Sequence, residues 1–199
     1  MRSVLLALAA VLLLAGCEMY TPASPDEIAR ARYVSSEPPS ITLMSMVNAR
    51  SGKSAHVGLL INGSEQVLFD PAGTFTHPDL PRAGDIHYGM TPRFVDYYER
   101  YHARFDYYVE AQKVPASREE ADLIFANARA HGKSMKMTCA LAMAEVLRPV
   151  PRFAGAPSSL QPEALRAWFA ALPGVETHFV RDADIGKNNV WETAGAPAG

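Results

Sequence analysis

Two residues, Cys139 and His56, have the types and surroundings that nucleophilic catalysis requires. Cys139 follows Thr138 at the predicted start of a helix, where unpaired N–H groups and the positive end of the helix dipole favour a thiolate over a thiol. His56 begins an apolar strand, directly after two small residues. An imidazole that accepts the thiol proton makes a cysteine an effective nucleophile at neutral pH. We therefore predict that Cys139 and His56 form a nucleophile–base pair.

A third polar group must orient the imidazole ring, and Asp70 is the candidate, at the end of the strand that pairs with that of His56. In a hairpin the two side chains share a face only if the connecting loop has an odd number of residues. A three-residue loop at 62–64 meets this condition, whereas a two-residue Asn-Gly turn at 62–63 puts Asp70 on the other face. In the second case the ring must be oriented by Glu65, His87 or a backbone group.

The elements that must position these residues follow from the hydrophobic periodicity. Apolar runs between turn residues predict strands at 41–48, 56–61, 66–70 and 175–181, and alternating residues predict one at 105–111. Helical periods and capping residues predict helices that begin at Thr91-Pro92, Ser117 and Thr138, with Thr138 as the N-cap, and a further helix over 165–172. The predicted fold class is α+β, an antiparallel sheet with helices packed on it.

Composition limits both the architecture and the partners. The chain has 199 residues, 48% of them hydrophobic, which is enough for one sizeable core. A net charge of -2 gives no basic surplus to neutralise a phosphate backbone, so no nucleic-acid partner is expected. We predict one domain over residues 40–182, followed by a disordered tail over 183–199 that ends in small residues and proline.

The N-terminus is predicted to be a secretory signal over residues 1–16, with Arg2 before an apolar run from Val4 to Leu14. The following Leu14-Ala15-Gly16-Cys17 resembles the lipobox of bacterial lipoproteins. This resemblance implies that Cys17 carries acyl chains such as palmitate and holds the protein to a membrane of the cell envelope. Residues 17–39 contain several prolines and are predicted to form a flexible tether.

With Cys17 acylated, Cys139 has no intramolecular partner for a disulfide, because the chain has two cysteines. The exported domain would then carry one free thiol into an oxidising compartment, where exposed thiols are readily oxidised. A catalytic role accounts for keeping such a thiol. The alternative is a structural one, since free cysteine is often buried and Cys139 shares a helical stripe with apolar residues.

The stretch Ser54-Ala55-His56-Val57-Gly58-Leu59-Leu60-Ile61 with Leu68-Phe69-Asp70-Pro71, and the later Thr138-Cys139-Ala140-Leu141-Ala142, resemble the motifs of a known family. They are similar to those of the permuted papain-like thiol hydrolases, the NlpC superfamily branch with YiiX- and YaeF-type proteins. The resemblance implies a circularly permuted papain-like arrangement, with the His-bearing strands before the Cys-bearing helix.

The resemblance further implies cleavage of an amide or ester through an acyl-thioester on Cys139, with His56 as base and then acid. Peptide or cell-wall amides are the expected substrates. The sequence departs from the pattern in having no Gln or Asn close upstream of Cys139 to stabilise an oxyanion, so backbone N–H groups must do so. The same scaffold could act on lipid acyl groups, or serve as a non-catalytic binding or spacing module.

Other polar clusters are weaker candidates. Asp70 also fits a turn start, in Asp70-Pro71-Ala72-Gly73. His77, Asp79, Asp85 and His87 fall in one segment without a recognised metal-ligand spacing, so neither a metal nor another cofactor is expected. The tyrosines at 97, 98, 101, 107 and 108 are interpreted as packing residues with their hydroxyls at the surface.

Overall fold

The computed structural model describes residues 21–181 of the chain. Within this range seven strands form one antiparallel sheet in the order β4-β5-β3-β2-β1-β6-β7, which confirms the α+β class. The strands are β1 (Ser40–Asn48), β2 (Ser54–Asn62), β3 (Gln66–Phe69), β4 (Arg82–Ala83), β5 (Ile86–Tyr88), β6 (Tyr107–Pro115) and β7 (Glu176–Val180). The helices are α2 (Pro25–Ala31), α3 (Pro92–His102), α4 (Arg118–His131), α5 (Cys139–Leu147) and α6 (Pro162–Ala170), with a 3₁₀ turn at Pro151–Phe153.

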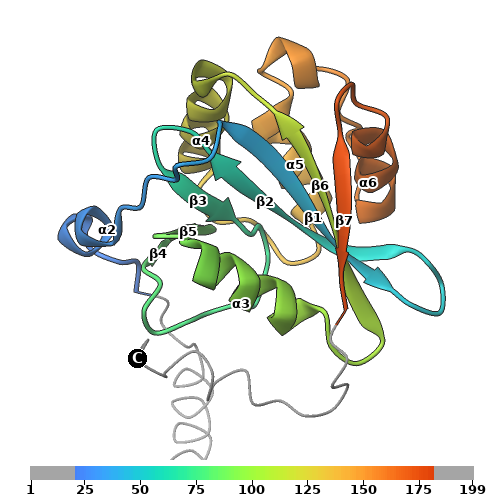
Figure 1. Ribbon diagram of the computed structural model, residues 1–199, viewed down its shortest axis with the longest axis horizontal. Helices are drawn as coiled ribbons and strands as arrows, with labels where there is room; N and C mark the ends of the chain where they lie inside the picture. The colour runs from blue at the N-terminus through green and yellow to red at the C-terminus, as the bar shows by residue number, and fades with distance from the viewer. Residues whose placement is uncertain (1–20, 182–199) are drawn as a thin grey trace, which may run out of the picture.

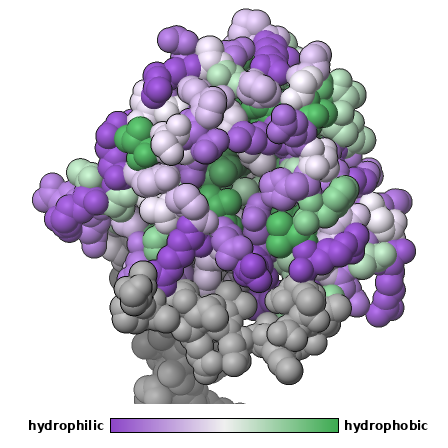
Figure 2. Space-filling view, in the orientation of Figure 1, coloured by the Kyte–Doolittle hydropathy of each residue, from purple (hydrophilic) through white to green (hydrophobic). Residues whose placement is uncertain are grey.

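The sheet is covered on both faces (Figure 1). Alternate residues of β1 and β2, such as Leu43 and Leu59, pack in one core with side chains of α4, α5 and α6. The intervening residues, such as Met44 and Leu60, pack in a second core with tyrosines of α3. Figure 2 shows the α3 face as mainly hydrophilic, with apolar residues visible near its middle. Because β1 and β2 are buried on both faces, they read as nearly continuous apolar runs.

The helix boundaries follow local capping chemistry. Ser117 and Glu120 form a reciprocal capping box at the start of α4, and Gly132 ends that helix at a φ of 76°. The Thr91 side chain accepts a hydrogen bond from the N–H of Phe94, which caps α3. Both predicted helix starts are therefore confirmed, and α3 holds its C-terminal residues over the sheet.

The β2–β3 hairpin has a three-residue loop at 63–65, because Asn62 pairs with Gln66. The loop lies one position later than the predicted three-residue alternative, but its odd length keeps His56 and Asp70 on one face. A second irregularity lies on the other side of β2: Met46 pairs with His56 and Val47 with Ser54, so Ala55 is an extra residue in the ladder. Such a bulge bends a strand and re-aims its side chains.

The segment predicted as a flexible tether makes defined contacts wherever the structure describes it. The N–H of Ala23 donates to the carbonyl of Arg82, and the N–H of Gln66 donates to the carbonyl of Tyr33. Asn62 donates through its side chain to the carbonyl of Pro38. Residues 21–39 thus run along the β3 side of the sheet, with α2 near β4 (Figure 1).

The predicted signal segment, the lipidation site Cys17 and the predicted tail lie outside the described residues. Between residues 21 and 181 no helix is both long and apolar enough to cross a membrane.

Candidate active site

The His56 ring is held by Asp70 through a hydrogen bond of 2.6 Å between Nε2 and Oδ1. Asp70 is fully buried just after β3, and its Oδ1 also accepts a hydrogen bond of 3.1 Å from the hydroxyl of Tyr98 on α3. The ring is therefore oriented by Asp70, not by the alternatives Glu65 and His87. Since Nε2 faces the carboxylate, Nδ1 is the ring nitrogen left for another partner.

The other group that acts on His56 is the Cys139 thiol, which together with Asp70 raises the pKa of His56. Cys139 is the first residue of α5 and belongs to the core on the α5 face, with 5% of the residue exposed. The His56 side chain is 21% exposed. The two meet beside the first half of β2, which has no neighbour on this side because β3 pairs only with residues from Leu59 onward. The structure thus brings together the three residues predicted to act together.

Thr138 occupies the N-cap position of α5 as predicted, but its side chain does not cap the helix. Its hydroxyl instead donates to the carbonyl of Met135 at 2.8 Å, and its side chain makes no cap hydrogen bond. The first-turn N–H groups of α5, beginning with that of Cys139, consequently lack a side-chain acceptor among the described residues. A helix start of this kind leaves N–H donors next to the thiol.

The ionisable groups of the site stabilise each other's charged forms. Burial by itself would lower the pKa of His56, but hydrogen bonds to Asp70 and Cys139 outweigh burial and raise this pKa to about 10. Burial would raise the pKa of Asp70, but the hydrogen bond from His56 and the neighbouring histidines lower it to about 2. At neutral pH the favoured state is therefore an imidazolium beside a carboxylate.

Two further histidines, the buried His87 and the half-buried His102, lie near Asp70 and behave in the opposite way. Burial lowers the pKa of His102 and of His87 to about 4 in each case, so both are neutral at pH 7. The His102 ring stacks on that of His56 with centroids 6.2 Å apart, and its Nδ1 donates to the carbonyl of Tyr98. Neither ring nitrogen of His87 has a hydrogen-bond partner among the described residues. At neutral pH the site therefore contains one charged histidine, His56, and two neutral ones, His87 and His102.

These pKa values predict that the free energy of unfolding is greatest near pH 6.5. The contribution of His56, whose folded-state pKa is raised, is complete below about pH 6.5 and is lost as the pH rises through about 10. His87 and His102, whose folded-state pKa values are lowered, disfavour folding as the pH falls from about 6.5 to about 4.

Urea unfolding at pH 5, 6.5 and 9.5 measures this dependence. The loss between pH 6.5 and 9.5 is expected to be about 1–4 kcal/mol, since one pKa unit corresponds to about 1.4 kcal/mol. His56→Gln should remove most of this alkaline loss while leaving the acid side unchanged. An equal alkaline loss in His56→Gln would show that His56 does not carry it.

Two glycines make room for this arrangement. A Cβ at position 58 would lie 2.4 Å from the Tyr98 hydroxyl oxygen, and a Cβ at position 73 would lie 2.0 Å from Asp70 Oδ2. Gly58 and Asp70 lie next to the terminal Leu59–Phe69 pair of the hairpin, and the absence of a side chain at position 58 leaves space for the Tyr98 hydroxyl to reach the carboxylate.

Gly58→Ala is accordingly expected to lower the free energy of unfolding by about 1–3 kcal/mol, as overpacked core substitutions do. In a Tyr98→Phe background the same substitution should cost much less, because the next closest atom, Tyr98 Cζ, lies at 3.3 Å. A double-mutant cycle measured by urea denaturation gives this coupling. Additive costs would mean that the hydroxyl does not limit the space.

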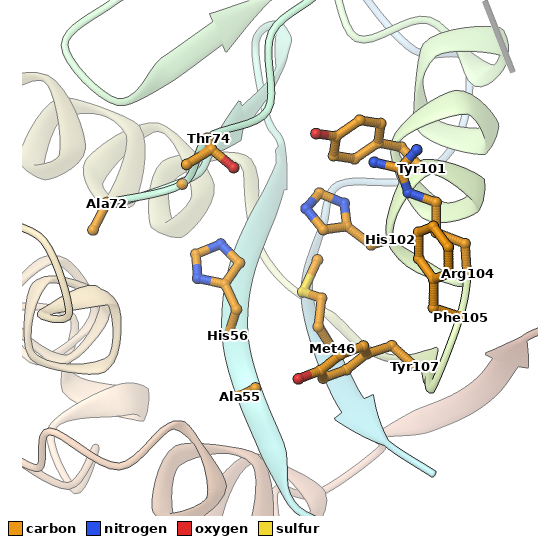
Figure 3. A pocket seen from close by; sticks show the side chains of 11 residues that line it. Met46, Ala55, His56, Ala72, Thr74, Tyr101, His102, Arg104, Phe105 and Tyr107 are labelled. Carbon is orange, nitrogen blue, oxygen red and sulfur yellow. The ribbon is translucent and has the colours of Figure 1, made fainter. Parts of the chain in front are cut away.

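A cavity of about 410 Å³ lies next to His56, lined by residues of β1, β2, the loop after β3 and the end of α3 (Figure 3). His56 and His102 both point into it. The three non-glycine residues with positive φ between residues 21 and 181 all lie close to the site. Ala72 and Phe105 line the cavity, and Met137 precedes Cys139 by two positions. Strained backbone of this kind is concentrated at functional sites.

The other predicted cluster does not assemble. Asp85 accepts hydrogen bonds from Arg82 and from the N–H of Ser134, while His87 is buried behind it. No group of three or more His, Cys, Asp or Glu side chains suited to a metal ion is present within the described range. The hydroxyl of Tyr98 was expected at the surface, and this interpretation is wrong, because that residue is fully buried.

Sequence reasoning missed three contributors to the site: Tyr98, His102 and Gly58. The first two have the helical period of packing residues, which conceals their polar contacts. The third, a glycine inside a strand of apolar residues, was the available signal, because it indicates a close approach of another group.

Comparisons of this chain with protein-family models, with curated proteins and with solved structures return no match.

Proposed function

We propose that this protein is a thiol hydrolase in which Cys139 attacks an amide or ester carbonyl. The Cys139 Sγ–C bond forms while the carbonyl π bond opens to an oxyanion, and the thiol proton resides on His56. His56 then gives this proton to the leaving amine or alcohol as its bond to the carbonyl carbon breaks. Water, deprotonated by His56, hydrolyses the resulting thioester and regenerates the thiol.

The observation that carries the proposal is the Cys139–His56–Asp70 chain of contacts. One histidine joins a thiol to a buried carboxylate, and the same carboxylate oxygen also accepts a hydrogen bond from Tyr98. A neutral structural histidine needs no such partner on both sides. The raised pKa of His56 supports an imidazolium beside the thiol and the carboxylate in the resting state.

The oxyanion is expected to be stabilised by backbone N–H groups. The start of α5 supports this role, because its first-turn donors have no side-chain cap among the described residues. Donors aimed at the developing charge typically contribute about 3 kcal/mol to transition-state stabilisation. A Gln or Asn upstream of Cys139 is then not required.

The proposal includes the permuted papain-like arrangement, with the His-bearing strands before the Cys-bearing helix, and peptide or cell-wall amides as substrates. The element order β2, β3 and later α5 is compatible with it. The lipobox-like segment at Cys17 supports a lipid-anchored location in the bacterial cell envelope.

The direct test is to trap the acyl-enzyme on the full chain carrying Cys17→Ser, in which Cys139 is the remaining cysteine. Incubation with p-nitrophenyl valerate should release p-nitrophenol in a burst and add one valeryl group to Cys139, as seen by peptide mass spectrometry. Cys139→Ser should give no burst and Asp79→Asn, an exposed carboxylate variant, an unchanged one. Absence of acylation at Cys139 would reject the hydrolase and favour the binding or spacing module.

A further inference from the structure

The cavity beside His56 has an unbalanced charge. Among the described residues that line it there is no Asp or Glu, and Arg104 is the one side chain there with a permanent charge. Arg104 is half-buried between α3 and β6, and its guanidinium lies 3.9 Å from the centroid of the Tyr101 ring. The cavity thus combines aromatic walls with one cation.

Arg104 differs in its partners from two other arginines packed against the sheet, Arg82 and Arg166. Arg82 and Arg166 each form ion pairs with buried or half-buried carboxylates. The nearby Asp106 pairs instead with Arg50, at 3.5 Å. Arg104 forms no ion pair within residues 21–181, so its guanidinium edge remains available for an anion.

The position of Arg104 relative to the reacting pair limits where an anion would lie on a substrate. Figure 3 shows Arg104 beside Tyr101 and Phe105, with His102 between it and His56. A substrate group that reaches Arg104 must therefore extend past the His102 ring, several bonds from the carbonyl that Cys139 attacks. The wall that this group would follow is formed by Met46 and Tyr107.

From this geometry we propose that the cavity selects acyl substrates that carry a carboxylate several bonds from the scissile carbonyl, with Arg104 as the residue that binds it. The proposal rests on the proposed hydrolase function and adds the class of acyl group. Planar guanidinium groups bind carboxylates through paired hydrogen bonds, and stacking on Tyr101 holds the plane of Arg104 in place.

The surrounding charges favour the same substrates. The protonated His56 ring adds a second positive charge at the cavity wall, and His102 stays neutral there. The Asp70 carboxylate is fully buried behind His56 and does not line the cavity. An anionic acyl group therefore meets positive charge at two places on the cavity wall, Arg104 and the protonated His56.

Matched p-nitrophenyl esters test the proposal on the full chain carrying Cys17→Ser. The anionic mono-esters of succinate, glutarate and adipate are compared with the neutral butyrate, valerate and hexanoate esters, in which a methyl group replaces the carboxylate. We expect kcat/KM to favour the anionic ester of the longer pairs by about tenfold, the size of a charge-assisted hydrogen bond at a partly exposed site. Arg104→Gln should bring the ratio near one, and Arg104→Lys should restore part of it.

Arg129→Gln is the matched control, because Arg129 also lies over an aromatic ring, that of Phe125, but on α4. It should leave the ratio unchanged. An equal anionic preference in wild type and Arg104→Gln, or no preference in wild type, would overturn the assignment of Arg104 while leaving the hydrolase intact.

If no ester acylates Cys139, the proposed function fails, and the cavity is judged by binding alone. Calorimetry of monomethyl glutarate with the Cys139→Ala chain should then show binding that Arg104→Gln removes. Equal binding by both chains, or none by either, would overturn the anion site as well.

Discussion

Replacing His56 by alanine is expected to slow alkylation of Cys139 by iodoacetamide at pH 6.5 by about 50-fold. The thiolate is the reacting species, and an unassisted thiol with a pKa of ~8.5 is only about 1% ionised at this pH. In wild type the proton is held on His56, which Asp70 keeps charged across a 2.6 Å hydrogen bond. The rate of wild type should therefore be nearly independent of pH between 6 and 8, whereas that of His56→Ala should rise about tenfold per unit.

The measurement uses the Cys17→Ser chain, so that the label reports on Cys139. His178→Ala is the matched control, since His178 also pairs with a carboxylate, that of Glu99, but lies on β7. It should change the rate by less than about twofold. Because 5% of Cys139 is exposed, the experiment also decides whether reagents reach the thiol. Labelling that begins only in denaturant would place Cys139 in the core and remove the nucleophile from the proposal.

Asp70→Asn is expected to lower kcat/KM for ester hydrolysis by about 10²–10⁴-fold, the range seen when the acid that orients a catalytic histidine loses its charge. The substitution keeps the size of the side chain but removes the negative charge that opposes the effect of burial on the pKa of His56. With burial unopposed, His56 should be neutral at pH 7, and the thiol should keep its proton. The alkylation profile should then shift toward that of an ordinary thiol.

Tyr98→Phe tests the positioning of Asp70 separately from its charge. It removes the hydrogen bond from Tyr98 to Asp70 Oδ1 but keeps the carboxylate ionised. Its loss in kcat/KM should stay within about tenfold, and its free energy of unfolding should fall by about 1–2 kcal/mol. If Asp70→Asn retained the wild-type alkylation profile, the carboxylate would have only a structural role.

The sequence predicted those parts of the site that local rules govern. Runs of apolar residues located β1, β2 and β3. The parity rule gave the condition for His56 and Asp70 to share a face, but the loop was left open between two and three residues, and three is the length in the structure. The start of α5 at Cys139 was also predicted correctly, although the reason given for it was not. A hydroxyl can bond to several carbonyls within its own turn, and the tertiary path of residues 133–138 decides which one it meets.

The features that were missed depend on long-range packing. β4 and β5 contain two and three residues, too few for an alternating pattern to be recognised. The contacts of residues 21–39 are mainly made by backbone groups, such as the N–H of Gln66 with the carbonyl of Tyr33. Every residue type except proline carries both of these groups, so the sequence does not indicate such contacts. The hydrogen bond of Tyr98 to Asp70 requires that α3 cross the sheet at one place, which helical periodicity does not specify.

The order of the elements ties the chemistry of Cys139 to the folded state. His56 and Cys139 are separated by roughly eighty residues of chain, and two helices and four strands lie between the end of β2 and the start of α5. Contacts so distant in sequence form late, after much of the loop-closure entropy has been lost. In the nascent or unfolded chain Cys139 is thus an ordinary thiol without a base, and its reactivity is acquired with the native topology. Its labelling rate can therefore serve as a built-in reporter of folding, sensitive to any change that separates α5 from the sheet.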